Sequence, residues 1–108
     1  MHIQLVTFTL DGITDADLRA RADAIAPTFA QLPGLYSKVW LADSTHNTYG
    51  GLYTWRDRDA MQAYRSGELY TTAVRDNPAF ADVHSTAFAV LDGPTRRTAP
   101  DRPEATQG

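Results

Sequence analysis

Aromatic and basic side chains alternate along two neighbouring segments near the middle of the 108-residue chain. The first segment carries Tyr36, Lys38 and Trp40, and the second carries Tyr49, Tyr53 and Trp55. Alternate residues share one face of a strand, so each set would line one surface. Indole and phenol rings stack on planar molecules, and phenolic hydroxyls orient a ligand's oxygen atoms. The pattern therefore favours a slot for a small aromatic ligand; the alternative is that these rings only pack a core or an interface.

Three side chains could move a proton in such a slot, and we predict Tyr53, His46 and Lys38 as catalytic. Lys38 is the only lysine, and partial burial would lower the pKa of its amine toward that of a useful base or enolate stabiliser. The alternative for Lys38 is an edge-strand charge that reaches water. His46 lies in a polar loop and has an ordinary pKa near neutrality, but a solvated loop histidine is its alternative.

The predicted substrate-binding residues extend beyond the two segments. They are Trp40, Tyr36, Trp55, Tyr64 and His84. His84 could reach a pocket from the last strand, but it forms no nucleophilic pair with Ser85, because adjacent strand residues point to opposite faces.

Other kinds of site have little support. The chain has no cysteine, which excludes a thiolate nucleophile and a disulfide. Its three histidines show no metal-ligand spacing, so we predict no metal and no cofactor; haem bound through His46 or His84 stays an open alternative. Gly50-Gly51 lies inside a predicted strand and is no phosphate loop. Glycines there make room for a ligand or, the favoured interpretation, for an aromatic ring of a partner subunit.

Composition and charge restrict the class of protein. The net charge of −3 and the pI of about 5.4 do not favour a nucleic-acid partner. No apolar run approaches the ~20 residues of a membrane span, and no signal peptide is recognisable, so the predicted location is cytoplasmic. Residues 93–108 hold no large apolar side chain and three of the six prolines. We predict one domain over residues 1–92 and a flexible C-terminal tail over 93–108.

The order of predicted elements defines the fold class. Strands are expected over residues 2–10, 35–42, 49–55 and 83–91. One helix begins after a cap at Thr14 and is expected to bend or divide at Pro27. A second helix covers about 57–66, and a further helical turn or two follows Gly67. This is the ferredoxin-like βαββαβ order: an α+β fold with a four-stranded antiparallel sheet and both helices on one face.

Both faces of this sheet are predicted to be apolar. In the first strand, Val6, Phe8 and Leu10 alternate with Ile3 and Leu5. The chain has helices to cover only one face. We therefore predict a homodimer that pairs through the sheet face.

The central motifs resemble those of the YdhR-like mono-oxygenase family, a branch of the dimeric α/β-barrel superfamily that includes antibiotic-biosynthesis mono-oxygenases. They are Pro33-Gly34-Leu35, Lys38-Val39-Trp40, the run from Gly50 to Trp55, and Ala63-Tyr64. The resemblance implies a dimeric α/β barrel with a pocket between sheet and helices in each protomer. Better-known relatives oxidise anthrone-like compounds without flavin or metal, and other members close rings or bind haem.

Residues and resemblance together favour a cofactor-independent mono-oxygenase that acts on a small aromatic or polyketide-like substrate. A polar group would remove a proton, and the resulting carbanion would reduce dioxygen directly. A polyketide cyclase or isomerase in the same pocket is the alternative. A non-catalytic dimeric protein that binds small molecules or responds to stress is a third hypothesis.

Overall fold

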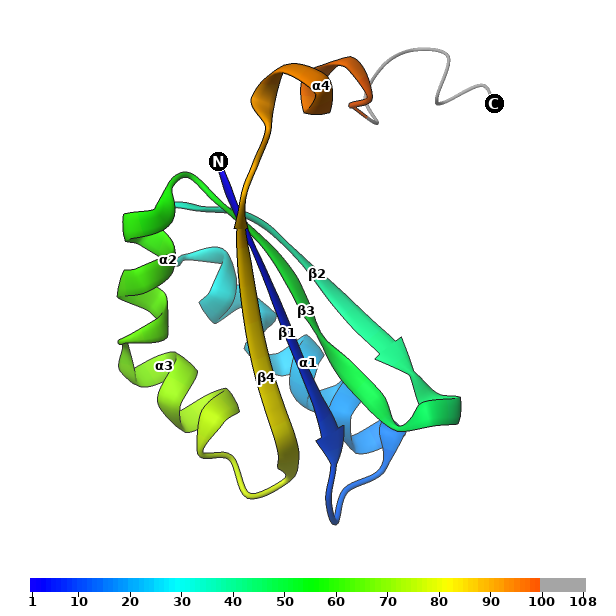
Figure 1. The fold of residues 1–108 in the computed structure, drawn as a ribbon. Helices are drawn as coiled ribbons and strands as arrows, with labels where there is room; N and C mark the ends of the chain where they lie inside the picture. The colour runs from blue at the N-terminus through cyan, green and yellow to red at the C-terminus, as the bar shows by residue number, and fades with distance from the viewer. Residues whose placement is uncertain (100–108) are drawn as a thin grey trace.

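The computed structural model describes residues 1–99, which form one sheet and its covering helices (Figure 1). The strands are β1 (His2–Leu10), β2 (Leu35–Asp43), β3 (Thr48–Trp55) and β4 (Phe80–Ala89). The helical elements are α1 (Asp15–Ala30), η1 (Ser44–His46), α2 (Arg58–Arg65), α3 (Glu68–Tyr70), η2 (Thr71–Arg75) and α4 (Asp92–Arg97). The order of these strands and of the helices between them confirms the predicted ferredoxin-like α+β class.

The four strands are antiparallel and lie in the order β2-β3-β1-β4. β1 is therefore paired on both sides, with His2 opposite Trp55 of β3 and Ala89 of β4. β2 and β4 are the edges. The register of β2 shifts between Leu35 and Ser37, so the edge strand carries an irregularity at the start of the predicted slot.

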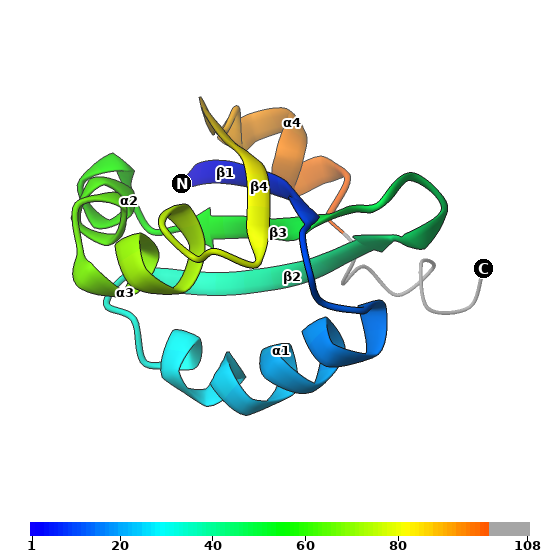
Figure 2. The same ribbon diagram turned by 90° about the horizontal axis from the view of Figure 1, so that it is seen from below.

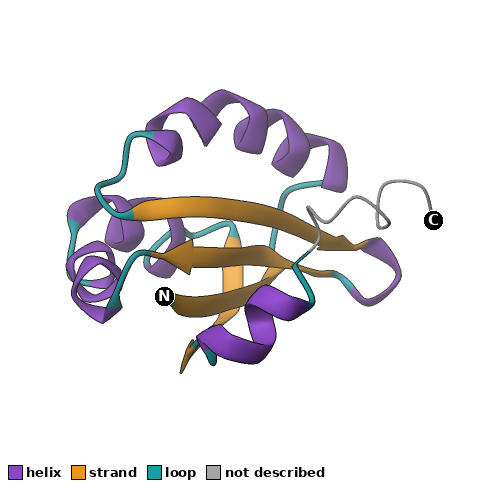
Figure 3. Ribbon diagram, turned by 90° about the horizontal axis from the view of Figure 1, so that it is seen from above, coloured by secondary structure: helices purple, strands orange, loops and turns teal. Residues whose placement is uncertain are grey.

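Helices α1 and α2 cover one face of the sheet, as predicted. Figures 2 and 3 show α1 running along β2 on that side, whereas α4 lies on the opposite side. The side chains of Gln4, Val6 and Phe8 on β1 point to the covered face and are buried. We call this the inner face, and the opposite surface the outer face.

The start of α1 follows the sequence prediction closely. Thr14 accepts a hydrogen bond from the Asp17 amide, and the Asp17 side chain accepts one from the Thr14 amide, which completes a capping box. Pro27 does not divide the helix, which continues to Ala30. Pro27 and Asp23, whose carbonyl loses its partner, are both exposed, so water can replace the missing hydrogen bond.

The C-terminal region differs from the prediction in its first part. Residues Asp92–Arg97 form α4, a short helix that begins one residue before the segment predicted as a flexible tail and extends into it. Thr95 donates its amide to the Leu91 carbonyl, and the amino group of Met1 lies 3.9 Å from Asp92. The rest of the predicted tail, residues 100–108, lies outside the described residues. Within residues 1–99, no helix is long and apolar enough to cross a membrane.

Candidate active site

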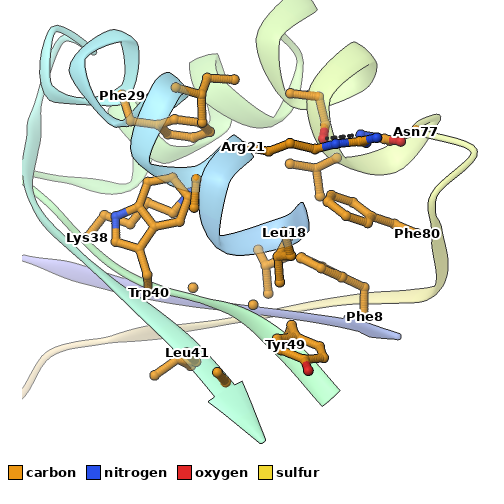
Figure 4. Close-up of a pocket in the computed structure, with 18 of the residues that line it drawn as sticks. Phe8, Leu18, Arg21, Phe29, Lys38, Trp40, Leu41, Tyr49, Asn77 and Phe80 are labelled. Carbon is orange, nitrogen blue, oxygen red and sulfur yellow. Dashed lines mark hydrogen bonds between the residues drawn. The ribbon is translucent and has the colours of Figure 1, made fainter. Parts of the chain in front are cut away.

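A cavity of about 440 Å³ lies between the inner face of the sheet and α1 (Figure 4). Its volume falls in the range of small-molecule pockets. Its wall is mainly apolar and comes from every layer of the fold. Residues that line it include Val6 and Phe8 of β1, Leu18, Arg21, Ile25 and Phe29 of α1, Lys38 and Trp40 of β2, Tyr49, Gly51 and Tyr53 of β3, and Asn77 and Phe80 near β4. The site is therefore built by residues far apart in sequence.

The amine of Lys38 is enclosed by aromatic rings. Its Nζ lies 3.5 Å from the ring centroid of Phe29, 3.5 Å from that of Trp40 and 4.7 Å from that of Tyr53. Burial lowers the pKa of Lys38 from 10.5 to about 7. Among the described residues that line the cavity there is no carboxylate to pair with it. The side chain of this edge-strand lysine thus points inward. The alternative prediction, a charge that reaches water, does not describe it.

Glycine at position 51 makes room for this lysine. A Cβ atom at Gly51 would lie 2.8 Å from Cε of Lys38 and 3.2 Å from the Tyr53 ring. The favoured sequence interpretation assigned this space to a ring from a partner subunit. Instead, the lysine stem and a ring of the same chain fill it, and the remaining space belongs to the cavity.

Tyr53, whose ring lies beside the amine, forms a buried pair with Tyr64, which does not itself line the cavity. Their hydroxyl oxygens lie 2.9 Å apart and share a hydrogen bond. Burial is the main cause that raises the pKa of both phenols well above the ordinary value. Both hydroxyls are therefore protonated at neutral pH, which makes them hydrogen-bond donors rather than bases.

Trp55 belongs to the core next to the cavity. Its side chain is 0% exposed, and its Nε1 donates a hydrogen bond of 3.1 Å to Gln4. Gln4 in turn donates to the Ser85 hydroxyl at 3.1 Å. Trp55 stacks on Tyr53 with 5.9 Å between centroids, so it supports the wall from behind and does not line the cavity itself.

Three predicted site residues lie away from the cavity. His84 is opposite Thr7 in the sheet register, which directs its side chain to the outer face, so it does not reach the pocket as expected. His46 is in η1 at the hairpin tip, where its Nδ1 lies 2.8 Å from Asp43, and this contact lowers the pKa of Asp43. Tyr36 is 59% exposed and does not line the cavity.

The sequence interpretation missed the contribution of α1. Leu18, Arg21 and Phe29 line the cavity from this helix, and Figure 4 shows Arg21 extending toward Asn77 at the end opposite Lys38. The helix was predicted, but none of its side chains was assigned to the site. The available signal was the position of Arg21 three residues after Leu18, since residues three and four apart share a helix face.

A second polar cluster lies at the rim of the cavity. Tyr49 donates a hydrogen bond of 2.6 Å to Asp15, which also accepts from Ser44 and Arg19. These bonds, with Arg19 first, lower the pKa of Asp15 to about 2. They join α1 to the β2–β3 hairpin across the mouth.

The cavity does not supply a histidine for haem. His46 and His84, the residues expected to bind it, are both outside the cavity, and no imidazole is among its described lining residues. Residues 1–99 also contain no cluster of three or more His, Cys, Asp or Glu side chains that could bind a metal ion. The residues present thus do not fit a histidine-ligated haem.

Comparison with family models gives one match that spans nearly the whole chain. The model described as "Putative mono-oxygenase ydhR" matches residues 3–100. A search among curated proteins gives no significant match.

Solved structures with the same fold include several oxygenases. A putative antibiotic biosynthesis monooxygenase from Deinococcus radiodurans superposes with a TM-score of 0.69 at 20% identity, over 83% of this chain and 92% of that one. SnoaB, a cofactor-independent oxygenase from Streptomyces nogalater, gives 0.65 at 21% identity, over 83% and 93%. The haem degrader MhuD from Mycobacterium tuberculosis, with two haems in its active site, gives 0.68 at 18% identity, over 84% and 96%. At these identities the likeness establishes the fold.

Proposed function

The chain belongs to the family described as "Putative mono-oxygenase ydhR", and from this premise we propose that it is a cofactor-independent mono-oxygenase for a small planar aromatic or polyketide-like substrate. One observation carries the proposal: the Lys38 amine, which has a pKa of about 7, lies among aromatic rings in an apolar cavity of about 440 Å³. SnoaB, which shares the fold, is a cofactor-independent oxygenase, and this supports the same interpretation.

Binding uses the two ends of the cavity differently. Phe29 and Trp40 are edge-to-face, with centroids 5.4 Å apart, and they offer apolar surfaces to a planar ring system. Arg21 and Asn77 lie at the other end, where they can donate hydrogen bonds to the substrate's phenolic or carbonyl oxygens. The substrate's acidic position is thereby held near Lys38.

Proton removal is the task of Lys38. With a pKa of about 7, roughly half of the amine is unprotonated at neutral pH and can accept a proton from an activated C–H or phenol. The resulting ammonium then stabilises the substrate anion at short range in an apolar site. Tyr53 keeps its hydroxyl proton and acts in binding rather than as the base.

Oxygen chemistry follows from the anion. For an anthrone, the carbanion transfers an electron to O₂, and the two radicals combine to form a C–O bond. The hydroperoxide then loses water, so one oxygen atom enters the new carbonyl and the other leaves as water. The substrate supplies all the electrons.

Oxygen uptake with anthrone tests the proposal. The wild-type chain should consume one O₂ for each anthraquinone formed, above the non-enzymatic rate, and Lys38→Met should lose at least ten-fold in rate. Arg65→Met, on an exposed position of α2 outside the cavity, should retain the full rate. No uptake above background contradicts the proposal, and turnover that continues without oxygen indicates the cyclase alternative.

The protein is further proposed to act as a homodimer that pairs through the outer face of the sheet. Val39 and Phe88 are exposed there by 52% and 58%, and Ile3 and Leu5 share that face by the register. A second copy of the chain that packs against this patch would remove its apolar surface from water. The cytoplasm remains the predicted location.

A further inference from the structure

We propose that Lys38 is a carbonyl-reactive amine, which condenses with an aldehyde or ketone group on a planar aromatic ligand to form an imine inside the cavity. This activity goes beyond the proposed oxygenation, because the amine acts as a nucleophile instead of a base and no oxygen is needed. The two activities share a cavity and a residue, but each can fail without the other.

The position of the amine carries the proposal. Nζ of Lys38 lies at the cavity wall, between the rings of Phe29 and Trp40 at 3.5 Å from each centroid. Rings on both sides of the nitrogen keep water away from it, and Lys38 is one of the residues that line the pocket. A planar ligand that stacks on Trp40 or Phe29 would hold a ring-attached carbonyl beside Nζ.

Burial of the amine also favours its neutral, nucleophilic form. The titratable groups that line the same cavity are Arg19 and Arg21 from α1, and Tyr49 and Tyr53 from β3. From the η2–β4 side the polar group is the uncharged Asn77. With no carboxylate among these described residues, burial lowers the pKa of Lys38 to about 7. About half of the amine is then nucleophilic at pH 7, against roughly one in a few thousand for an ordinary lysine.

The condensation is balanced by one molecule of water. The Nζ lone pair attacks the carbonyl carbon, a C–N bond forms, and a proton moves from nitrogen to oxygen to give a carbinolamine. Protonation of that hydroxyl and loss of water give the iminium ion, which releases one proton to solvent to form the imine. No electrons are exchanged, and water and the imine are the only products.

The opposite end of the cavity sets the ligand class. Arg21 extends toward Asn77 there, and its guanidinium can donate hydrogen bonds to a ligand. The Asn77 side chain already donates to the Ala73 carbonyl and accepts from the Ala79 amide. An aromatic carbonyl compound that carries a phenolate or carboxylate at its far end would satisfy both ends of the pocket. Aliphatic aldehydes lack the ring surface that Phe29 and Trp40 complement.

A reductive-trapping experiment tests the inference, and the composition of the chain makes it easy to interpret. Lys38 is the only lysine, so the chain has two primary amines, that of Lys38 and its amino terminus. The folded protein is incubated anaerobically at pH 7 with 2-naphthaldehyde and sodium cyanoborohydride, which reduces imines. Intact mass and peptide mapping then give the ratio of Lys38 labelling to amino-terminal labelling. The amino terminus of each molecule is the internal reference.

We expect Lys38 to be labelled at least ten-fold faster in the folded chain than in the chain unfolded in urea at the same pH. The Lys38-to-terminus ratio should fall several-fold with propanal in place of the aromatic aldehyde, and also in Phe29→Leu. Lys38→Met should carry label at the terminus alone. Equal labelling of Lys38 in folded and unfolded chains, or label confined to the terminus of the wild type, overturns the inference. Because the reaction contains no oxygen, these outcomes are independent of the oxygen-uptake assay.

Discussion

The two faces of the sheet both carry apolar side chains, but these are buried on one face and exposed on the other. On the inner face, Gln4, Val6 and Tyr53 are at most 1% exposed, and no buried side-chain polar atom among residues 1–99 is left without a partner. On the outer face, Val39 and Phe88 are more than half exposed. The helices α1 and α2 cover one face, and the other is an apolar surface that stays largely exposed in the described part of this chain.

The inner face itself divides into a filled half and a hollow half. Under α2, Trp55 packs 5.2 Å from Tyr64, and Met61 is 1% exposed. Under α1, small residues such as Gly51 and Ala22 line the cavity, and the chain's single lysine enters it. A small domain thus concentrates its packing at one end of the sheet and keeps space for a ligand at the other.

The two tryptophans provide the strongest test of this division. Trp55→Ala removes a fully buried ring and leaves Gln4 without its donor, so we expect a loss of about 3–5 kcal/mol in the free energy of unfolding. Trp40→Ala, at a position 40% exposed, should cost about 1–2 kcal/mol. Urea unfolding measures both. Equal losses would contradict the contrast between the filled half and the hollow half.

Burial of the Lys38 amine should make stability depend on pH. The folded-state pKa of about 7 lies below the unfolded value of 10.5, so between these values the unfolded chain binds more protons and the free energy of unfolding rises with pH. Below pH 7 the amine is protonated in both the folded and the unfolded chain, so the full free-energy cost of burying the charged amine remains.

Lys38→Met should therefore be more stable than the wild type at pH 7, by on the order of 3 kcal/mol after allowance for partial exposure. The difference should shrink toward pH 10.5. Urea midpoints of both chains at pH 7, 8.5 and 10 measure this trend. A stability difference between the two chains that does not change with pH would contradict the prediction.

A charge on the outer face should break the proposed dimer without damage to the cavity. In Phe88→Glu, a carboxylate replaces a ring that is 58% exposed, and its burial against a second copy should weaken association at least 100-fold. Sedimentation velocity at micromolar concentration should then give a monomer. Arg75→Glu, an exposed change on η2, is the control that should remain dimeric. If the wild type sediments as a monomer, the proposed homodimer is contradicted.

Ligand affinity should respond to one methyl group in the hollow half. In Gly51→Ala the new Cβ approaches Lys38 Cε and the Tyr53 ring, so both must shift into the space that a ligand needs. We expect three- to ten-fold weaker binding of an aromatic ligand such as 2-naphthol, with the dissociation constant measured by fluorescence or calorimetry. Gly93→Ala, whose Cβ meets no atom within 4 Å, should leave the affinity unchanged.

The fold was predictable from local patterns, and its exceptions have local causes. Alternation in the strands and the cap at Thr14 predicted element order and the start of α1. The helix was predicted to bend or divide at Pro27, and it is not divided, because water can replace the hydrogen bond that Pro27 removes. Helix α4 forms in a segment with no large apolar side chain, which periodicity cannot detect.

The site was predictable only in part. Lys38, Trp40 and Tyr53 were chosen from alternation and do line the cavity. His84 was misplaced because its face depends on the pairing of β4 with β1, which the sequence does not reveal. Arg21 and Asn77 come from segments more than 50 residues apart. Arg21 shares a helix face with Leu18, but that spacing alone does not distinguish a pocket-lining arginine from an exposed one.

The protonation of Lys38 is the most direct test of the central claim that the hollow half is a ligand cavity with a poised amine. Because the chain has one lysine, ¹³C-labelled lysine gives a single side-chain Cε resonance. Its NMR titration should have a midpoint near 7, and an aromatic ligand should shift the resonance. A midpoint near the ordinary value of ~10.4, with no response to ligand, would contradict the account.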